Sequence, residues 1–292
     1  RYKCTAGPLP IVFSTNLFVL FLPGQVHLTL AAIALALLSK AMVVRDGRHV
    51  MNPSAFGIAA VGLLTLMFPD LGYGDTAREF NLPPNMTEVV LLLGLVVQTR
   101  VPVVLTSIGC FLALYAWQQV FGVMIFAPWW APVALVIVLL VTDPATVPKS
   151  PRGRLLYGFV AGVLMEVMAA LTTAAFQQDF YAKVMCVPLA NALVPQLELL
   201  VAKIPDLRVL RLLERRYNLA HIAIWVALMA GALLTGHKAD EFTMTNRHST
   251  LHQRNRTPFI TLAADGRPRC ADNPMWCQPF SFAREIDAWT KH

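Results

Sequence analysis

The sequence predicts an all-α protein, in which a polytopic bundle of membrane helices is followed by a mostly irregular tail. Of the 292 residues, 56% are hydrophobic and only 14% are charged, whereas about a quarter of the residues of a soluble domain carry a charge. The apolar residues form long runs separated by short polar segments. The cations behind the net charge of +7 fall mainly in those short segments, which is typical of membrane topology determinants. We therefore expect no nucleic-acid partner.

Nine apolar segments define a predicted transmembrane domain, 1–236, and a polar tail occupies 237–292. Several segments are shorter than the ~20 residues that a straight helix needs to cross the hydrocarbon core. Short spans interrupted by Pro or Gly are typical of transport-type folds with repeated halves and broken helices. Helices that lie at a shallow depth against their neighbours explain them equally well. The segments are 8–22, 26–44, 53–69, 86–98, 101–121, 127–143, 154–176, 180–202 and 218–236.

The distribution of cations predicts the orientation. Arginines and lysines gather in alternate connections, while the other connections hold only Arg78 and Lys183. The positive-inside rule then places the N-terminus and 203–217 in the cytoplasm and the tail outside. The cations on the predicted cytoplasmic side are Arg1, Lys3, Arg45, Arg48, Arg100, Lys149, Arg152, Arg154, Lys203, Arg208, Arg211, Arg215 and Arg216.

The segment 204–217 alternates leucines with arginines at helical spacing. This pattern predicts an interfacial helix whose guanidinium groups face anionic lipid headgroups. A solvated connector that only fixes the topology explains the same pattern.

The tail contains two features that bear on partners. Cys270 and Cys277 are separated by six residues, and a disulfide between them is permitted outside the cytoplasm; two free cysteines are the alternative. Large aromatic side chains along a segment too poor in apolar positions for its own core favour burial against another subunit. Folding of the tail over the protein's own external loops is the competing explanation. These aromatic residues are Phe259, Trp276, Phe280, Phe282 and Trp289.

Two proline motifs indicate shaped helix ends. Asn52-Pro53 precedes one apolar run, and Asp143-Pro144 follows another. Proline disfavours helical geometry in the residue before it, and an Asn or Asp side chain can bind the freed backbone amides. Shortly after the second motif, Arg152 and Arg154 can bind a phosphate, a lipid headgroup or a carboxylate.

Ionisable and helix-breaking residues within the spans are the remaining candidates. Glu166 lies well inside 154–176, where a carboxylate is costly and often functional; a protonated or lysine-paired structural residue is the alternative. Pro188, Asn191 and Pro195 predict a broken helix, while Glu198 lies nearer the cytoplasmic end and is more simply structural. The sequence shows no metal-ligand spacing, acid–base pair or activated nucleophile, so no catalytic or metal-binding residue is assigned.

Three longer stretches carry a family resemblance, namely "HVMNPSAFGIAAVGLLTLMFP", "LVTDPATVPKSPRGRLLYGFVAGVL" and "PLANALVPQLE". Over about residues 10–203 the chain resembles the RnfD/NqrB family, which comprises the D subunit of the Rnf electron-transport complex and the B subunit of the sodium-pumping NADH–quinone reductase. The stretch "SKAMVVRDGRHVMNP" resembles more closely still the UnbU-like branch from enediyne biosynthesis clusters. The motif positions are Asn52, Pro53, Gly57, Thr142, Asp143, Pro144, Arg152, Gly153 and Arg154.

The resemblance implies a multi-helix membrane protein with internally repeated halves that carries flavins and conducts electrons. It aligns the first segment with the family's third helix, so two helices would precede Arg1. Redox members hold a covalent flavin mononucleotide on a threonine of a Ser-Gly-Ala-Thr-like motif, but the corresponding connection, 70–88, contains no such motif. We therefore expect no covalent flavin, while a non-covalent flavin stays open.

These observations leave three functional hypotheses. The first in order of support is an accessory or scaffold subunit of a larger membrane electron-transport complex, which binds other membrane subunits through its ninth span and tail. An electron-transfer subunit with a non-covalent flavin or quinone is the alternative. A small-solute or ion transporter is the weaker alternative, because repeated halves with broken helices suit a transporter too.

Overall fold

The computed structural model describes residues 8–18, 20–21, 26–45, 47–71, 74–75, 86–121, 130–176, 181–203, 218–239, 260–262 and 268–270. The chain divides into two compact units, 1–235 and 236–292. In the described part of the first unit the chain is almost entirely helical, as the composition predicts.

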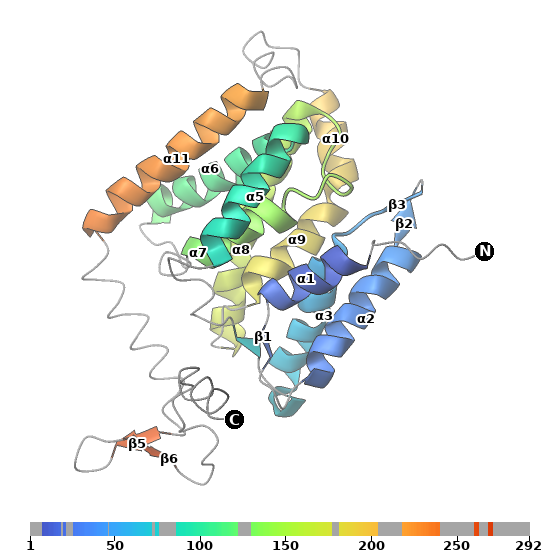
Figure 1. Cartoon of the computed structure of the whole chain (residues 1–292), viewed down its shortest axis with the longest axis vertical. Coiled ribbons are helices and arrows are strands. Elements are labelled where there is room, and N and C mark those ends of the chain that lie inside the picture. The colour runs from blue at the N-terminus through green and yellow to red at the C-terminus, as the bar shows by residue number, and fades with distance from the viewer. Residues whose placement is uncertain are drawn as a thin grey trace, which may run out of the picture. The chain divides into compact units, whose positions relative to one another are not determined.

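The first half of the larger unit is a group of three helices, α1, α2 and α3, which pack against one another (Figure 1). A tight hairpin of two short antiparallel strands, β2 and β3, connects α2 to α3. A second antiparallel pair joins β1, which follows α1, to β4. The elements are α1 (Leu9–Phe18), β1 (Leu20–Phe21), α2 (Val26–Met42), β2 (Val44–Arg45), β3 (Arg48–His49), α3 (Pro53–Met67), the 3-10 turn Pro69–Leu71 and β4 (Gly74–Asp75).

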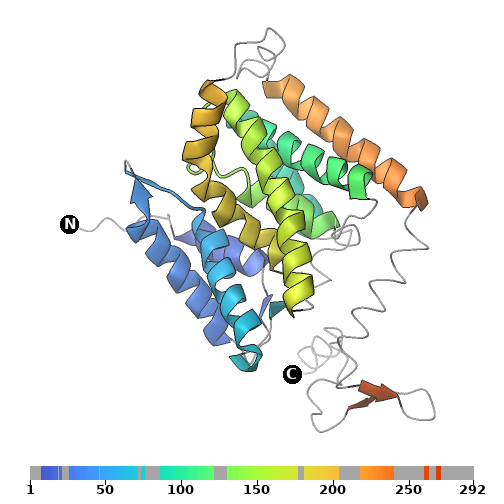
Figure 2. The ribbon, with the colours of Figure 1, turned by 180° about the vertical axis from the view of Figure 1, so that it is seen from behind.

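The second half is built around α8, which packs against α6, α9 and α10; Figure 2 shows α9 and α10 in yellow and gold beside α8. In the smaller unit, β5 pairs with β6 as an antiparallel hairpin within the predicted tail. The elements are α5 (Met86–Arg100), α6 (Val104–Phe121), α7 (Trp130–Leu135), a π-helix (Val136–Leu140), α8 (Pro151–Phe176), α9 (Ala182–Ala192), α10 (Val194–Ala202), α11 (Asn218–Ala239), β5 (Ile260–Leu262) and β6 (Pro268–Cys270).

Each of the nine apolar segments contains a helix, and most helix boundaries differ by a few residues from those of the segments; two of the differences involve prolines. The helix predicted from 154 already begins at Pro151, because proline is well suited to a first helical turn. The segment 180–202 is two helices that meet at an angle of 55°. Pro188 lies inside α9 and Pro195 at the start of α10, so the break predicted from the prolines is present.

Two of the described helices, α6 and α8, are long and apolar enough to cross a membrane, and a third span results if α9 and α10 are taken together. The helices α2 and α3 and residues 218–231 of α11 are apolar but shorter.

The surface of the larger unit is rich in large apolar side chains, whereas several polar ones are buried. On α5, for example, the exposed residues include Leu92, Leu93 and Val96. Glu166 and Asn191 are fully buried within the same unit. This distribution is compatible with an apolar surrounding, since polar groups in such a setting need partners inside the protein.

The contact between α6 and α8 depends on glycine. A Cβ atom at Gly158 would overlap the backbone carbonyl of Thr106, and one at Gly109 would overlap the carbonyl of Leu155. Backbone atoms cannot move aside as a flexible side chain can, so the two helices approach closely only because these positions lack a side chain. Small residues serve helix contacts in membranes in the same way.

Gly158→Ala should therefore push α6 and α8 apart and lower the free energy of unfolding by about 2 kcal/mol, the range for an overpacked interior. Unfolding by sodium dodecyl sulfate in mixed micelles would measure the change. Gly231→Ala is the matched control, because a Cβ there meets no atom within 4 Å. Equal stability of the two variants would contradict the close packing inferred for α6 and α8.

Candidate functional site

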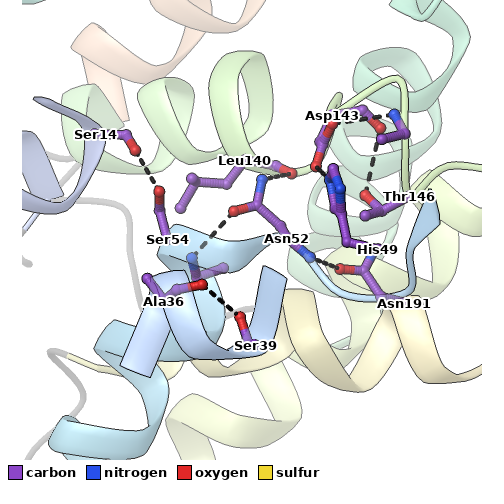
Figure 3. A network of polar contacts seen from close by, with 12 residues as sticks. Ser14, Ala36, Ser39, His49, Asn52, Ser54, Leu140, Asp143, Thr146 and Asn191 are labelled. Atoms are coloured by element: carbon purple, nitrogen blue, oxygen red, sulfur yellow. Dashed lines mark hydrogen bonds and ion pairs between the residues drawn. The ribbon is translucent and has the colours of Figure 1, made fainter. Parts of the chain in front are cut away.

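Asn52 begins α3 and joins it to two other parts of the bundle (Figure 3). Its side-chain oxygen accepts a hydrogen bond from Ala55 N at 3.1 Å, and Pro53 follows as the first helical residue. Its side-chain amide donates to the carbonyl of Leu140 at 3.3 Å, and its backbone N–H donates to Asn191 Oδ1 at 2.9 Å. One asparagine thus caps a helix and connects segments 88 and 139 residues away.

Asn191 lies at the end of α9, two residues before the break at Leu193. Besides accepting from Asn52, it donates from Nδ2 to the hydroxyl of Tyr157 at 2.6 Å. Tyr157 lies on α8, and both side chains are fully buried. The broken helix is therefore bound at its bend to the start of α3 and to α8.

The π-helix supplies the carbonyl that Asn52 contacts. Val141 N donates to Val136 O at 3.0 Å, which is the five-residue spacing of a π-helix. Thr142, two residues after the π-helix, is buried and donates its hydroxyl hydrogen to Val138 O. Leu140 is the last residue of this π-helix, and the last carbonyls of a helix have no partner within it. The side-chain amide of Asn52 is the donor that Leu140 O binds.

Asp143 forms the turn that follows. Its Oδ1 accepts from Ala145 N at 3.1 Å, and its backbone carbonyl accepts from Thr146 N at 3.1 Å. Its Oδ2 lies 3.3 Å from Nε2 of His49, at the end of the β2–β3 hairpin. Pro144 is exposed in this turn. The Asp-Pro motif therefore binds the hairpin through its carboxylate as well as shaping its own turn.

The N-terminus of α8 is bound by a carboxylate from α10. Glu198 Oε1 accepts from the backbone N–H of Lys149 at 2.6 Å and of Ser150 at 3.2 Å, while Oε2 accepts from the Ser150 hydroxyl at 2.8 Å. A negative charge at this end of a helix is favourable because the first amides have no partner in the helix. Gly153 permits the approach, since a Cβ there would lie 2.6 Å from Ser150 Oγ.

Arg154 fastens the same loop from the other side. Its Nε donates to Pro148 O at 3.0 Å, and one terminal nitrogen donates to Pro102 O at 2.6 Å. The second carbonyl belongs to the connection between α5 and α6, so Arg154 joins three helix ends. Arg152 is half-buried in the first turn of α8. Arg154 thus binds backbone carbonyls at the ends of neighbouring helices, which differ from the phosphate, headgroup and carboxylate partners considered from the sequence.

The remaining predicted positions lie in different surroundings. Gly57 is on α3, where a Cβ would overlap the carbonyl of Ala32 on α2. Glu166 is fully buried on α8, about 14 Å along the helix from Tyr157. Cys270 ends β6, but Cys277 and the segment 204–217 lie outside the described residues. The predicted disulfide and interfacial helix thus stay predictions.

The described residues include no group of three or more His, Cys, Asp and Glu side chains that could hold a metal ion. The contacts of the network described above are hydrogen bonds and the His49–Asp143 pair. No family model, no curated protein and no solved structure matches this chain.

Sequence reasoning did not single out His49 and Tyr157. His49 lies three residues before Asn52, in "RHVMNP", and Tyr157 lies four residues after Gly153 in an apolar stretch. A polar atom on an apolar helix needs a buried partner, and the hydroxyl of Tyr157 is such an atom, so this signal could have found Tyr157. His49 carries no comparable signal, because its partner is 94 residues away.

Asn191→Ala should lower the free energy of unfolding by about 2 kcal/mol or more, because it leaves the Asn52 amide and the Tyr157 hydroxyl buried without this partner. Tyr157→Phe should lower the unfolding free energy by less, since it removes only the bond between Asn191 and Tyr157 and leaves the one between Asn52 and Asn191. In the Asn191→Ala background, Tyr157→Phe should cost less than it does alone. Additive effects of the two substitutions, measured by unfolding in mixed micelles, would show that the bond is not formed.

Glu198→Ala should loosen α10 from α8, because three donors at the start of α8 lose their acceptor. We expect a loss of about 1–3 kcal/mol in unfolding free energy and faster amide exchange at Lys149 and Ser150. Glu198→Gln retains one acceptor oxygen, so its unfolding free energy should lie between those of the wild type and Glu198→Ala. Leu199→Ala, an exposed neighbour, is the control. Unchanged exchange at 149–150 in Glu198→Ala would refute the cap.

Proposed function

We propose that this chain is a multi-pass subunit of a bacterial inner-membrane complex, related to the RnfD/NqrB family, and that it serves as an accessory or scaffold component. Its helical part would form a bundle with internally repeated halves, with a cytoplasmic N-terminus and an external tail. Other membrane subunits would bind the tail and α11, and the segment 204–217 would bind lipid headgroups.

One observation carries this proposal. The three stretches that carry the resemblance lie far apart in the sequence, yet their residues bind one another. Asn52 of the first bonds to Leu140, the first residue of the second, and to Asn191 of the third. Tyr157 of the second bonds to Asn191, and Glu198 of the third caps α8. Motifs that converge in this way support a shared architecture, because each of them needs the others.

The membrane location is supported by the surface. Apolar side chains are exposed along α2, α5, α10 and α11, including Leu30, Leu92, Leu199 and Leu219. Large apolar areas on a soluble protein are uncommon and mark contact with a membrane or a partner. Both of these contacts are part of the proposal.

A scaffold role is favoured over a redox role because the polar atoms of the motif residues have hydrogen-bond partners within the protein. The side chains of Asn52 and Asn191 use both their oxygen and their nitrogen on protein partners. Both carboxylate oxygens of Asp143 and Glu198 also have partners within the chain. These contacts support a structural role for the motifs. The lack of a flavin-threonine motif in 70–88 points the same way.

Purification of the whole chain in a mild detergent should give other membrane subunits in defined proportion and no flavin absorption band in the visible range. Deleting 245–292 should release those subunits while the helical part stays folded, because the tail would be the binding arm. Mass spectrometry identifies the subunits, and circular dichroism reports the helices.

A visible flavin band in the intact, washed protein would favour the electron-transfer alternative and overturn the scaffold role. A colourless protein that stays a single chain in every detergent tested would overturn assembly. Retention of all subunits after the deletion would contradict the tail as the arm, and would direct the search to α11.

A further inference from the structure

The β2–β3 hairpin presents two arginines opposite each other. Arg45 pairs with Arg48, and Val44 pairs with His49, in antiparallel register. Gly47, at a positive φ of 74°, provides the left-handed residue of the tight connection. Directly opposite residues have Cβ atoms about 5 Å apart on one face, so the two guanidinium groups extend from the same side of the hairpin.

This arrangement is electrostatically unfavourable by itself. Like charges at directly opposite positions destabilise a strand pair. Both arginines are exposed, and the contact of their hairpin with Asp143 is made by His49. Asp46, between Arg45 and Gly47 in the sequence, lies outside the described residues. An anion bound between the two guanidinium groups would relieve the repulsion.

The hairpin is held so that the arginines face away from the bundle. Side chains alternate between the two faces of a strand. The ring of His49 lies 3.3 Å from the carboxylate of Asp143, and Figure 3 shows the two side chains together. Because His49 faces that loop, its neighbour Arg48 and the opposite Arg45 point to the other side. The cation pair is thus held at a fixed place on the surface.

The position along α2 indicates which anion is near. The hairpin begins two residues after α2 ends, and Figure 1 shows it at that end of the helix. The last turns of α2 expose Leu38 and Met42, the latter by 71%. If these side chains lie in lipid, as the proposed function requires, the hairpin lies at the level of the headgroups. Lys149, also exposed, follows the Asp143 turn that holds the hairpin.

We propose that Arg45 and Arg48 form a binding site for the phosphate group of an anionic lipid headgroup. This inference rests on the proposed membrane location. Guanidinium groups bind phosphate oxygens through pairs of parallel hydrogen bonds, which lysine cannot form. Two such groups on one tight hairpin can bind one phosphate together. The attraction is local to the hairpin and distinct from the general effect of cations at a membrane surface.

The test uses the whole chain in a neutral detergent and native mass spectrometry. Short-chain phosphatidic acid is the probe, and phosphatidylcholine with the same acyl chains is the reference lipid. Arg45→Gln/Arg48→Gln should weaken phosphatidic acid binding about tenfold or more, because two charge-assisted contacts are lost. Arg100→Gln/Lys203→Gln removes two other exposed cations and should change it by less than about twofold. Arg45→Lys/Arg48→Lys should be intermediate.

Equal weakening in the two glutamine double variants would mean a diffuse attraction and would overturn the site. So would unchanged binding in Arg45→Gln/Arg48→Gln, or equal affinity for the two lipids. Inorganic phosphate that competes at the affinity of the lipid would assign the site to free phosphate and overturn the lipid as its occupant.

Failure of the proposed function is separable from failure of this site. Resistance of the wild-type chain to carbonate extraction from membranes reports the membrane location, and co-purification reports assembly. Both should be the same in the Arg45→Gln/Arg48→Gln variant. A chain that carbonate extracts would overturn the proposed membrane function, while lipid binding in detergent would still report the arginine pair.

Discussion

The arrangement of the bundle depends on the need to satisfy backbone and amide groups at buried helix ends. A helix begins with amides and ends with carbonyls that have no partner within it, and an apolar surrounding offers none. Asn191 meets this need at the bend between α9 and α10, where it binds Asn52 N and the Tyr157 hydroxyl. Because it binds both α3 and α8, the two halves of the larger unit are fixed relative to one buried side chain.

The polar contacts and the glycine contacts are mutually dependent. Close approach of α6 and α8 needs Gly158 and Gly109, and it places the start of α8 beside the connection between α5 and α6. Arg154 can then reach Pro102 O. Glu198 in turn holds α10 against the same helix start. Charged side chains thus lie beside unpaired backbone groups at the ends of helices. The packing of small residues determines where those ends lie.

Sequence reasoning succeeded where the signal is local. The apolar runs located the helices, the Asn-Pro pair predicted the cap of α3, and Pro188 and Pro195 predicted the broken helix. It could not predict the π-helix, because the run 136–140 has no feature that separates five-residue from four-residue spacing. Nor could it pair His49 with Asp143, or Glu198 with the start of α8, because each pair is joined only by the tertiary fold. Local chemistry fixes an element's end, whereas the identity of its partner depends on the whole bundle.

The hydrogen-bond partners of the motif residues also indicate which positions are available to bind a ligand. The residues that carry the resemblance have structural partners: Asn52, Asn191 and Glu198 have their polar atoms engaged within the chain. A ligand at these positions would have to replace bonds already formed, and each buried group left without a partner costs about 1–3 kcal/mol. Exposed groups carry no such requirement. Arg45 and Arg48 keep their donors available at the surface, so binding there would require no rearrangement of the network beneath.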